Sequence, residues 1–222
     1  TFMERLVSAM AEMNDSFNEV TAEMLKVISD YDSVTGFQGA YNIRQDSMCA
    51  GRKNSENITI ESKTDKPGIN IRVKPGTKGE TVYIPACVTH SNVDDLVYND
   101  FFIGEGADVT IVAGCGVHSD GSETARHNGI HRFFLEKGAK VLYKEKHIGT
   151  GKGTGLRRID PVTDAYLKED SYLEMDTVQL RGVDRTTRST SAVLDKGAKI
   201  VVRERIMTDG DEDAVTKFKV EL

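Results

Sequence analysis

An internal repeat restricts the fold of this chain more than any other feature of its sequence. The repeat appears when Gly106, Gly138, Asp170 and Gly197 are aligned as anchors, at spacings of 32, 32 and 27 residues. Apolar residues stand three and five positions after each anchor: Val109, Val141, Leu173 and Ile200, and then Ile111, Tyr143, Met175 and Val202. Glycine at three anchors predicts a tight turn with positive φ, and the alternating apolar positions predict the inward face of a strand.

One copy of this unit cannot bury its apolar face alone, so successive copies are expected to stack. A strand on either side of each turn gives a flattened coil with two sheets, whose turns lie about 4.8 Å apart. A propeller is the competing repeat fold, but its blades usually need about 40 residues or more. We therefore predict an all-β solenoid domain over residues 41–222, with short strands at 58–60, 69–73 and 81–84 that are bounded by Pro67, Pro75 and Pro85.

The N-terminal segment, residues 1–35, has a different period. Apolar residues recur there at alternating steps of three and four: Met3, Leu6, Met10, Met13, Phe17, Val20, Met24 and Val27. This spacing predicts an amphipathic helix, or a helical hairpin broken near residues 14–16, that docks on the body of the protein. Partner binding or dimerisation through the methionine-rich face is the alternative.

Composition excludes several classes of function. The net charge of −6 and the isoelectric point of about 5.5 argue against a nucleic-acid partner, which usually requires a concentrated basic face. No stretch approaches the roughly 18 apolar residues of a membrane helix, and the first residues do not resemble a signal peptide, so we expect no membrane partner and a cytoplasmic location. Three cysteines are too few for a disulfide framework.

Several phrases of the sequence resemble one known family. The phrases VYNDFFIG at residues 97–104, VAGCGVH at 112–118 and HNGIH at 127–131 resemble the short archaeal and bacterial members of the SufB/SufD family. The segments at 177–180 and 192–194 are similar too. The resemblance runs from about residue 41 to residue 222, and several phrases in order are more specific than any single motif.

The resemblance implies a right-handed parallel β-helix that serves as a scaffold subunit of SUF-type iron–sulfur cluster assembly. It also implies a SufC-type ABC ATPase as partner, a SufB/SufD homologue or a second copy as the other subunit, and an iron–sulfur cluster that is held transiently. ATP would be hydrolysed by the partner, so we expect this chain to bind no nucleotide and not to be an enzyme. The sequence agrees, because it has no Gly-x-x-x-x-Gly-Lys-Ser/Thr phosphate loop, and the glycine run at 149–155 is expected to be a mobile loop or a phosphate or partner contact.

The chain departs from the family at its end. Family members usually continue through further turns into C-terminal helices that hold the ATPase, whereas this sequence stops at Leu222 while the strand alternation is still running. We therefore expect that the C-terminal part of the natural protein is missing, or that another chain caps the last turn, since natural proteins cover such edges.

Candidate ligands for a metal or cluster are Cys115, His118, His127, His131 and His147, because thiolate and imidazole are the donors that iron–sulfur clusters accept. His127 and His131 lie four residues apart, which places them on one face of a strand. The Cys115-Gly-Val-His118 spacing alone is a weak zinc signature. The plainer interpretation is that the histidines are ordinary loop or surface residues.

Cys115 and His147 both stand nine positions after an anchor, in a column with Gln179 and Ile206. Parallel stacking would place the two on neighbouring turns with their side chains on the inner face, where they could share a metal or cluster, or hold a thiolate by ion pairing. A buried pair that only packs, or a register slip at Gly114 and Gly116 that turns Cys115 outward, stays open.

Two other functions remain open. Some parallel β-helices are carbohydrate-active enzymes with clustered carboxylates, and Glu145 and Glu204 share the column seven after the anchor, two turns apart with Thr177 between them. A purely structural oligomerisation solenoid is the other alternative.

Overall fold

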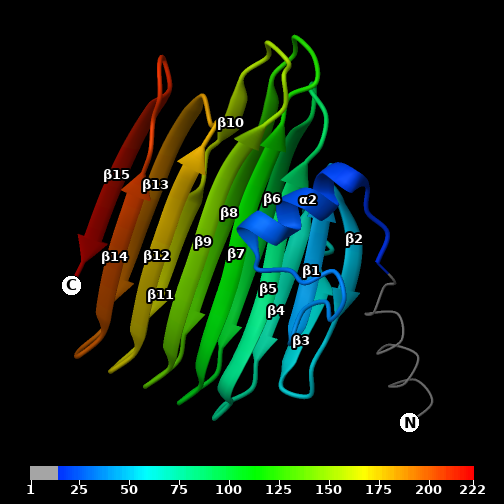
Figure 1. Cartoon of the computed structure of the whole chain (residues 1–222). Coiled ribbons are helices and arrows are strands. Elements are labelled where there is room, and N and C mark those ends of the chain that lie inside the picture. The colour runs from blue at the N-terminus through cyan, green and yellow to red at the C-terminus, as the bar shows by residue number, and fades with distance from the viewer. Residues whose placement is uncertain (1–14) are drawn as a thin grey trace.

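In the computed structural model, which describes residues 15–222, the alternating segments form strands that wind into a solenoid of about five turns (Figure 1). The first sheet contains β1 (Ala40–Gln45), β2 (Met48–Lys53), β5 (Lys78–Val88), β7 (Asp108–His118), β9 (Lys140–Thr150), β12 (Tyr172–Arg181) and β14 (Lys199–Ile206). The second contains β3 (Ile58–Ser62), β4 (Gly68–Val73), β6 (Asp94–Ile103), β8 (Ala125–Leu135), β10 (Arg157–Ile159), β11 (Val162–Leu167), β13 (Arg185–Leu194) and β15 (Asp213–Glu221).

The coil is right-handed and parallel, as predicted. The chain rises through the front sheet of Figure 1, crosses at the upper end to the rear sheet, and advances toward the C-terminus with each turn. Within residues 15–222 only the first strands depart from this rule, because β1 and β2 form one antiparallel hairpin and β3 and β4 form another. These two hairpins lie at the N-terminal end of the two sheets.

The anchors form the tight turns at the lower end of the coil. Gly106, Gly138, Asp170 and Gly197 have φ values of 67°, 66°, 58° and 72°, so the predicted positive φ is confirmed at all four. Asp170 is the one anchor of the four that is not glycine, and aspartate is among the few other residues that adopt the left-handed region of positive φ. Gly76, with a φ of 71°, makes one more turn of the same kind.

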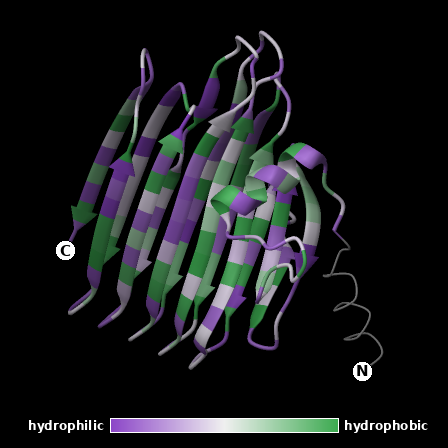
Figure 2. Ribbon diagram, in the orientation of Figure 1, coloured by the Kyte–Doolittle hydropathy of each residue, from purple (hydrophilic) through white to green (hydrophobic). Residues whose placement is uncertain are grey.

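Inward side chains near these turns form the apolar core. Phe101 and Phe133 stack on adjacent turns with ring centroids 4.6 Å apart, and Ile103 and Leu135 are buried beside them. Apolar and polar residues alternate along many strands in Figure 2, which is the pattern expected when one face of a sheet is inside.

The end of β5 differs from the prediction. The segments at 58–60 and 69–73 correspond to β3 and β4, but β5 runs through Pro85 to Val88 instead of ending there. Pro85 has no amide hydrogen, and it lies where the β1–β5 ladder is interrupted between Tyr83 and Ala86, so the missing donor is tolerated.

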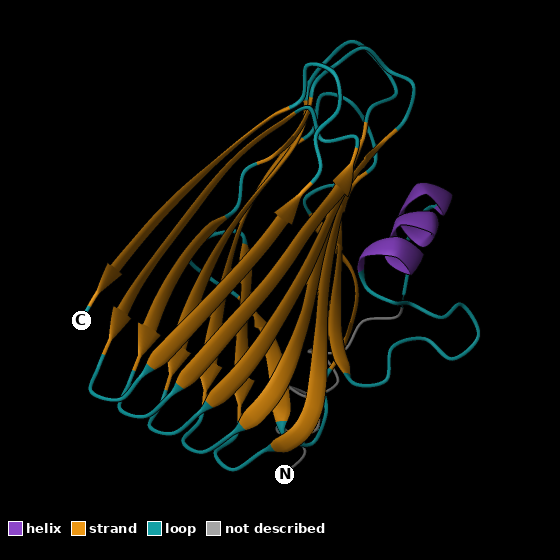
Figure 3. Ribbon diagram, turned by 60° about the vertical axis from the view of Figure 1, so that its left-hand side comes forward, coloured by secondary structure: helices purple, strands orange, loops and turns teal. Residues whose placement is uncertain are grey.

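Helix α2 (Glu19–Ile28) confirms part of the predicted helical segment. Asn18 caps it by accepting a 2.9 Å bond from the amide of Thr21, so Phe17 lies before the helix. Met24 and Ile28 are buried against the outer face of the first sheet, and the helix stands clear of the second sheet in Figure 3. The positions Met3, Leu6, Met10 and Met13 lie outside the described residues.

Glycines allow close approach at two places. A Cβ on Gly116 would come within 2.4 Å of the Met24 sulfur, so this glycine lets α2 sit directly on β7. A Cβ on Gly151 would lie 2.0 Å from the carbonyl oxygen of Ser119, so the glycine run at 149–155 packs against the loop of the preceding turn. Among residues 15–222, no helix has the length and apolar character needed to cross a membrane.

Candidate functional site

The interior of the solenoid changes from apolar to polar away from the tight turns. Inward positions nearer the opposite loops carry polar or ionisable side chains that are buried: Asp95, Asn99, His127, His131, Glu145, His147, Thr177, Gln179, Thr186 and Arg188. We call these residues the buried polar layer. Because burying polar groups costs free energy unless they are paired, the contacts within this layer decide what it can do.

Glu145 lies at the centre of the layer. Tyr143 donates a hydrogen bond to its Oε2, and Arg188 contacts its Oε1 at 3.3 Å. The Nε2 atom of His147 lies 2.7 Å from the same Oε1, although its N–H bond is not aligned with that oxygen. Burial raises the pKa of Glu145, but His147 and Arg188 outweigh burial and hold the pKa well below its ordinary value, so the side chain is a carboxylate.

Both ring nitrogens of His147 lie close to charged side chains of the layer. Arg188 lies 3.3 Å from Nδ1, and because a guanidinium only donates, Nδ1 accepts and Nε2 carries the hydrogen that faces Glu145. Burial lowers the pKa of His147, and Glu145 only partly opposes this effect. His147 is therefore held as one neutral tautomer with no lone pair left for a ligand.

Cys115 is the register partner of His147, and the β7–β9 ladder shows no register shift over its length. Both side chains are buried, so the predicted placement on neighbouring turns is confirmed and the alternative of a slip that turns Cys115 outward is wrong. The alternative in which ion pairing lowers the pKa of Cys115 is not found. Burial raises the pKa of Cys115 well above its ordinary value, and the nearby Glu145 carboxylate raises it further, so the thiol is protonated.

His127 and His131 lie on the inward face of β8, and both are buried, so the interpretation as surface residues is wrong for them. The Nδ1 atom of His127 lies 3.0 Å from Oδ2 of Asp95, which also pairs with Arg44 at 2.8 Å. The Nδ1 atom of His131 lies 3.4 Å from the Tyr143 hydroxyl. Burial lowers the pKa of His131 to about 4, so this imidazole is neutral near pH 7.

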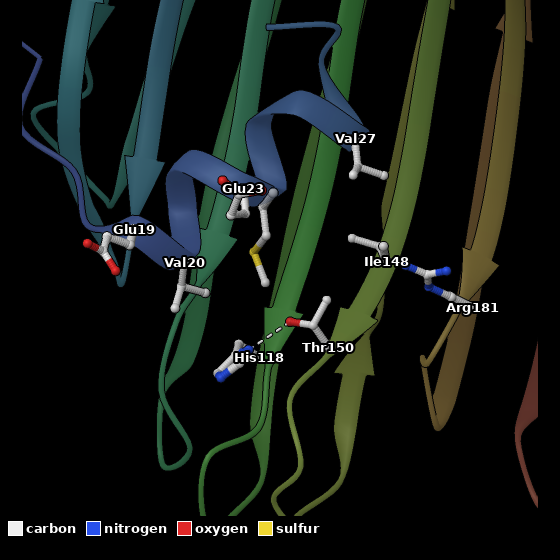
Figure 4. A pocket seen from close by; sticks show the side chains of 9 residues that line it. Glu19, Val20, Glu23, Val27, His118, Ile148, Thr150 and Arg181 are labelled. Carbon is white, nitrogen blue, oxygen red and sulfur yellow. Dashed lines mark hydrogen bonds between the residues drawn. The ribbon is translucent and has the colours of Figure 1, made fainter. Parts of the chain in front are cut away.

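His118 lies apart from the other candidates. Its Nδ1 contacts Thr150 Oγ1 at 2.8 Å, in a groove of about 430 Å³ between α2 and the outer face of the first sheet (Figure 4). The groove is lined by Val20, Ile148 and Arg181 among others, and none of the other four predicted ligands lines it. The structure thus brings Cys115, His127, His131 and His147 into the interior but leaves His118 outside.

The interior does not form a ready cage for a cluster. Over residues 15–222, no group of three or more His, Cys, Asp or Glu side chains is arranged to hold a metal ion. Iron–sulfur clusters take thiolates, with imidazole as a substitute, whereas the layer supplies one protonated thiol and three imidazoles. The predicted ligand roles of all five residues therefore stay predictions.

Several important members of the layer were not predicted from the sequence. Asp95 and Asn99 stand eleven and seven positions before Gly106, and Arg188 stands nine before Gly197. All three offsets are odd, so the three residues occupy inward positions. The parity that identifies inward positions after each anchor also identifies these three before it.

The comparisons with known proteins point to one family. Over 89 residues the chain is 32% identical to "Iron-sulfur cluster assembly SufBD family protein MTH1150 homolog" of Methanothermobacter thermautotrophicus strain Winter, and 30% identical to "Iron-sulfur cluster assembly SufBD family protein" of strain ATCC 29096 of that species. Each match covers 39% of this chain and 21% of the relative, so this chain aligns with about a fifth of the length of the curated relatives. No protein-family model matches. The chain is a relative of the SufB/SufD family, as its own phrases predict.

Proposed function

We propose that the chain is a scaffold subunit of SUF-type iron–sulfur cluster assembly and acts with a SufC-type ABC ATPase in the cytoplasm. The observation that carries the proposal is the buried polar layer, which places the Cys115 thiol and the imidazoles of His127 and His131, each with an unbonded Nε2, inside a solenoid related to the SufB/SufD family. Thiolate and imidazole are the donors that iron and its clusters accept. The iron–sulfur cluster is cargo that the scaffold receives and passes on, and ATP hydrolysis belongs to the partner.

The layer also argues against a purely structural solenoid. An interior ion pair usually contributes less stability than well-packed apolar residues of the same volume. The inward columns near the tight turns are apolar on every turn, so the fold itself does not need Glu145, His147 and Arg188. We interpret their presence as the result of a requirement other than stability.

The contacts of Glu145 disfavour the carbohydrate-active alternative. Glu145 and Glu204 do face the same column, two strands apart across Thr177, as predicted. Arg188 lies between them, 3.3 Å from one carboxylate and 3.6 Å from the other. Paired catalytic carboxylates need room for a sugar or a water between them, and here a guanidinium occupies that room.

Direct binding to the ATPase tests the partnership. The purified chain is mixed with the SufC-type ATPase of the same organism, and the mixture is studied by sedimentation velocity with and without ATP. We expect a complex that sediments faster than either protein, and an unchanged complex for Glu145→Gln, because Glu145 is buried and does not reach the surface. Two independent boundaries under all conditions would contradict the partnership.

A further inference from the structure

Two imidazole nitrogens face one small gap inside the solenoid. Gly129 lies between His127 and His131 on the inward face of β8, where it contributes no side chain. A Cβ placed on Gly129 would lie 3.1 Å from Nε2 of His127 and 2.9 Å from Nε2 of His131. The absent side chain therefore leaves a space toward which both nitrogens point.

The partners of the two rings leave these nitrogens free to bind a cation. A carboxylate only accepts, so the Nδ1 of His127 donates to Asp95 and Nε2 is left facing the gap. Tyr143 donates its hydroxyl hydrogen to Glu145, so its oxygen is available to accept from Nδ1 of His131, which again leaves Nε2 facing the gap. Histidines that bind metals almost always donate their other ring N–H to a carboxylate or another acceptor in this way.

A third donor lies on the neighbouring strand. Asn99 is the register partner of His131 in the β6–β8 ladder, and it is also an inward position. Its side chain is 7% exposed, and its Oδ1 has no hydrogen-bond partner in the described part of the chain. Buried acceptors are nearly always satisfied, so an unpartnered one on the strand next to the two imidazoles points to a bound group.

We propose that His127 and His131, with Asn99 beside them, bind one divalent first-row transition-metal cation at the gap over Gly129. Imidazole suits zinc, iron, copper and nickel, and a water molecule can complete the coordination, as it does in open zinc sites. Asp95 and Tyr143 act as positioning residues for the two rings. Cation binding at this site requires neither sulfide nor an ATPase. A protein without cation binding would therefore leave the proposed assembly function standing, and a protein without the assembly function would leave the cation site standing.

Cobalt absorption tests the site. Because His127 and His131 are 1% and 4% exposed, Co²⁺ is added both to the folded protein over a long incubation and to the culture during expression. We expect one Co²⁺ per chain, with d–d absorption bands and displacement by Zn²⁺. His127→Gln and His131→Gln should each weaken binding at least tenfold, and Tyr143→Phe should weaken it by about 10–100-fold, the usual range for a positioning residue.

Matched variants separate this site from adventitious binding. His90→Gln and His118→Gln change histidines outside the interior and should retain wild-type binding. Gly129→Ala fills the gap and should abolish binding, with circular dichroism to confirm the fold. If a glutamine variant does not fold, the ring ¹⁵N resonances of the wild type replace it: Zn²⁺ should shift both Nε2 signals. A wild type that binds no Co²⁺, loss of binding in His90→Gln or His118→Gln, or unchanged ring signals would each overturn the proposal.

Discussion

Replacing Arg188 with methionine should destabilise the protein, because Arg188 pairs with Glu145 at the centre of the buried polar layer. Arg188 is the only guanidinium that contacts Glu145 in the described structure, and both side chains are at most 4% exposed. The substitution keeps a long apolar side chain in place but leaves the Glu145 carboxylate buried with only the uncharged Tyr143 and His147 as close partners. Removal of one partner of a buried ion pair costs about 3–5 kcal/mol of the free energy of unfolding.

Thermal unfolding followed by circular dichroism measures this cost. In a domain of this length each kcal/mol lowers Tm by about 2–4 °C, so Arg188→Met should lower Tm by about 6–20 °C. The matched control is Arg203→Met, which removes a half-exposed guanidinium paired with Glu174 and should change the free energy of unfolding by less than about 1 kcal/mol.

The double variant Arg188→Met with Glu145→Gln decides whether the cause is the unpaired charge. Neutralising Glu145 removes the buried carboxylate, so the double variant should recover a substantial part of the stability that Arg188→Met loses. The reasoning would be refuted if Arg188→Met lowered the free energy of unfolding no more than Arg203→Met does. It would also be refuted if the loss in the double variant equalled the sum of the losses in Arg188→Met and Glu145→Gln.

Three further predictions concern the turns, the pH dependence and the helix. Gly138→Ala should cost about 1–2 kcal/mol, because only the positive φ opposes a Cβ there, whereas Asp170→Gly should be neutral or stabilising; urea unfolding measures both. Burial holds the pKa of His131 at about 4, below the 6.5 of an unfolded histidine, so between pH 6.5 and 4 only the unfolded chain takes up this proton. The free energy of unfolding should therefore fall by about 3 kcal/mol over that range, and His131→Gln should lack this part of the pH dependence in urea titrations. Gly116→Leu should displace Met24 and release α2 from β7, which limited proteolysis would detect as faster cleavage within residues 19–28 than in Gly121→Leu, where a Cβ meets only Ser91 at 3.6 Å.

The repeat was sufficient to predict the solenoid because residues at the same offset from their anchors pair with one another within one sheet. Parallel strands stack in register, so a column such as Cys115, His147 and Gln179 in the sequence becomes a column in space. The same logic correctly placed Glu145 and Glu204 on one column. Residues that share an anchor offset can therefore be assigned to one face of a sheet by their sequence positions alone.

Contacts between the two sheets could not be predicted in this way. The pairing of Glu145 with Arg188 joins residues 43 positions apart, on different turns and in opposite sheets. It depends on the distance between the sheets and on side-chain length, and neither follows from the register within one sheet. The sequence also left open a thiolate held by ion pairing with His147, whereas burial and the neighbouring Glu145 carboxylate raise the pKa of Cys115.

Anaerobic reconstitution tests the central claim, that this chain takes part in building iron–sulfur clusters. The chain is incubated with ferrous iron and sulfide in the presence of the SufC-type ATPase, and absorption and Mössbauer spectra are recorded for the wild type, for Cys115→Ser and for the control Cys49→Ser. The account predicts spectra of sulfur-ligated iron in the wild type and in Cys49→Ser, because Cys49 lies on β2 outside the buried polar layer, and reduced loading in Cys115→Ser. Spectra that show only loosely bound iron in all three proteins would contradict it.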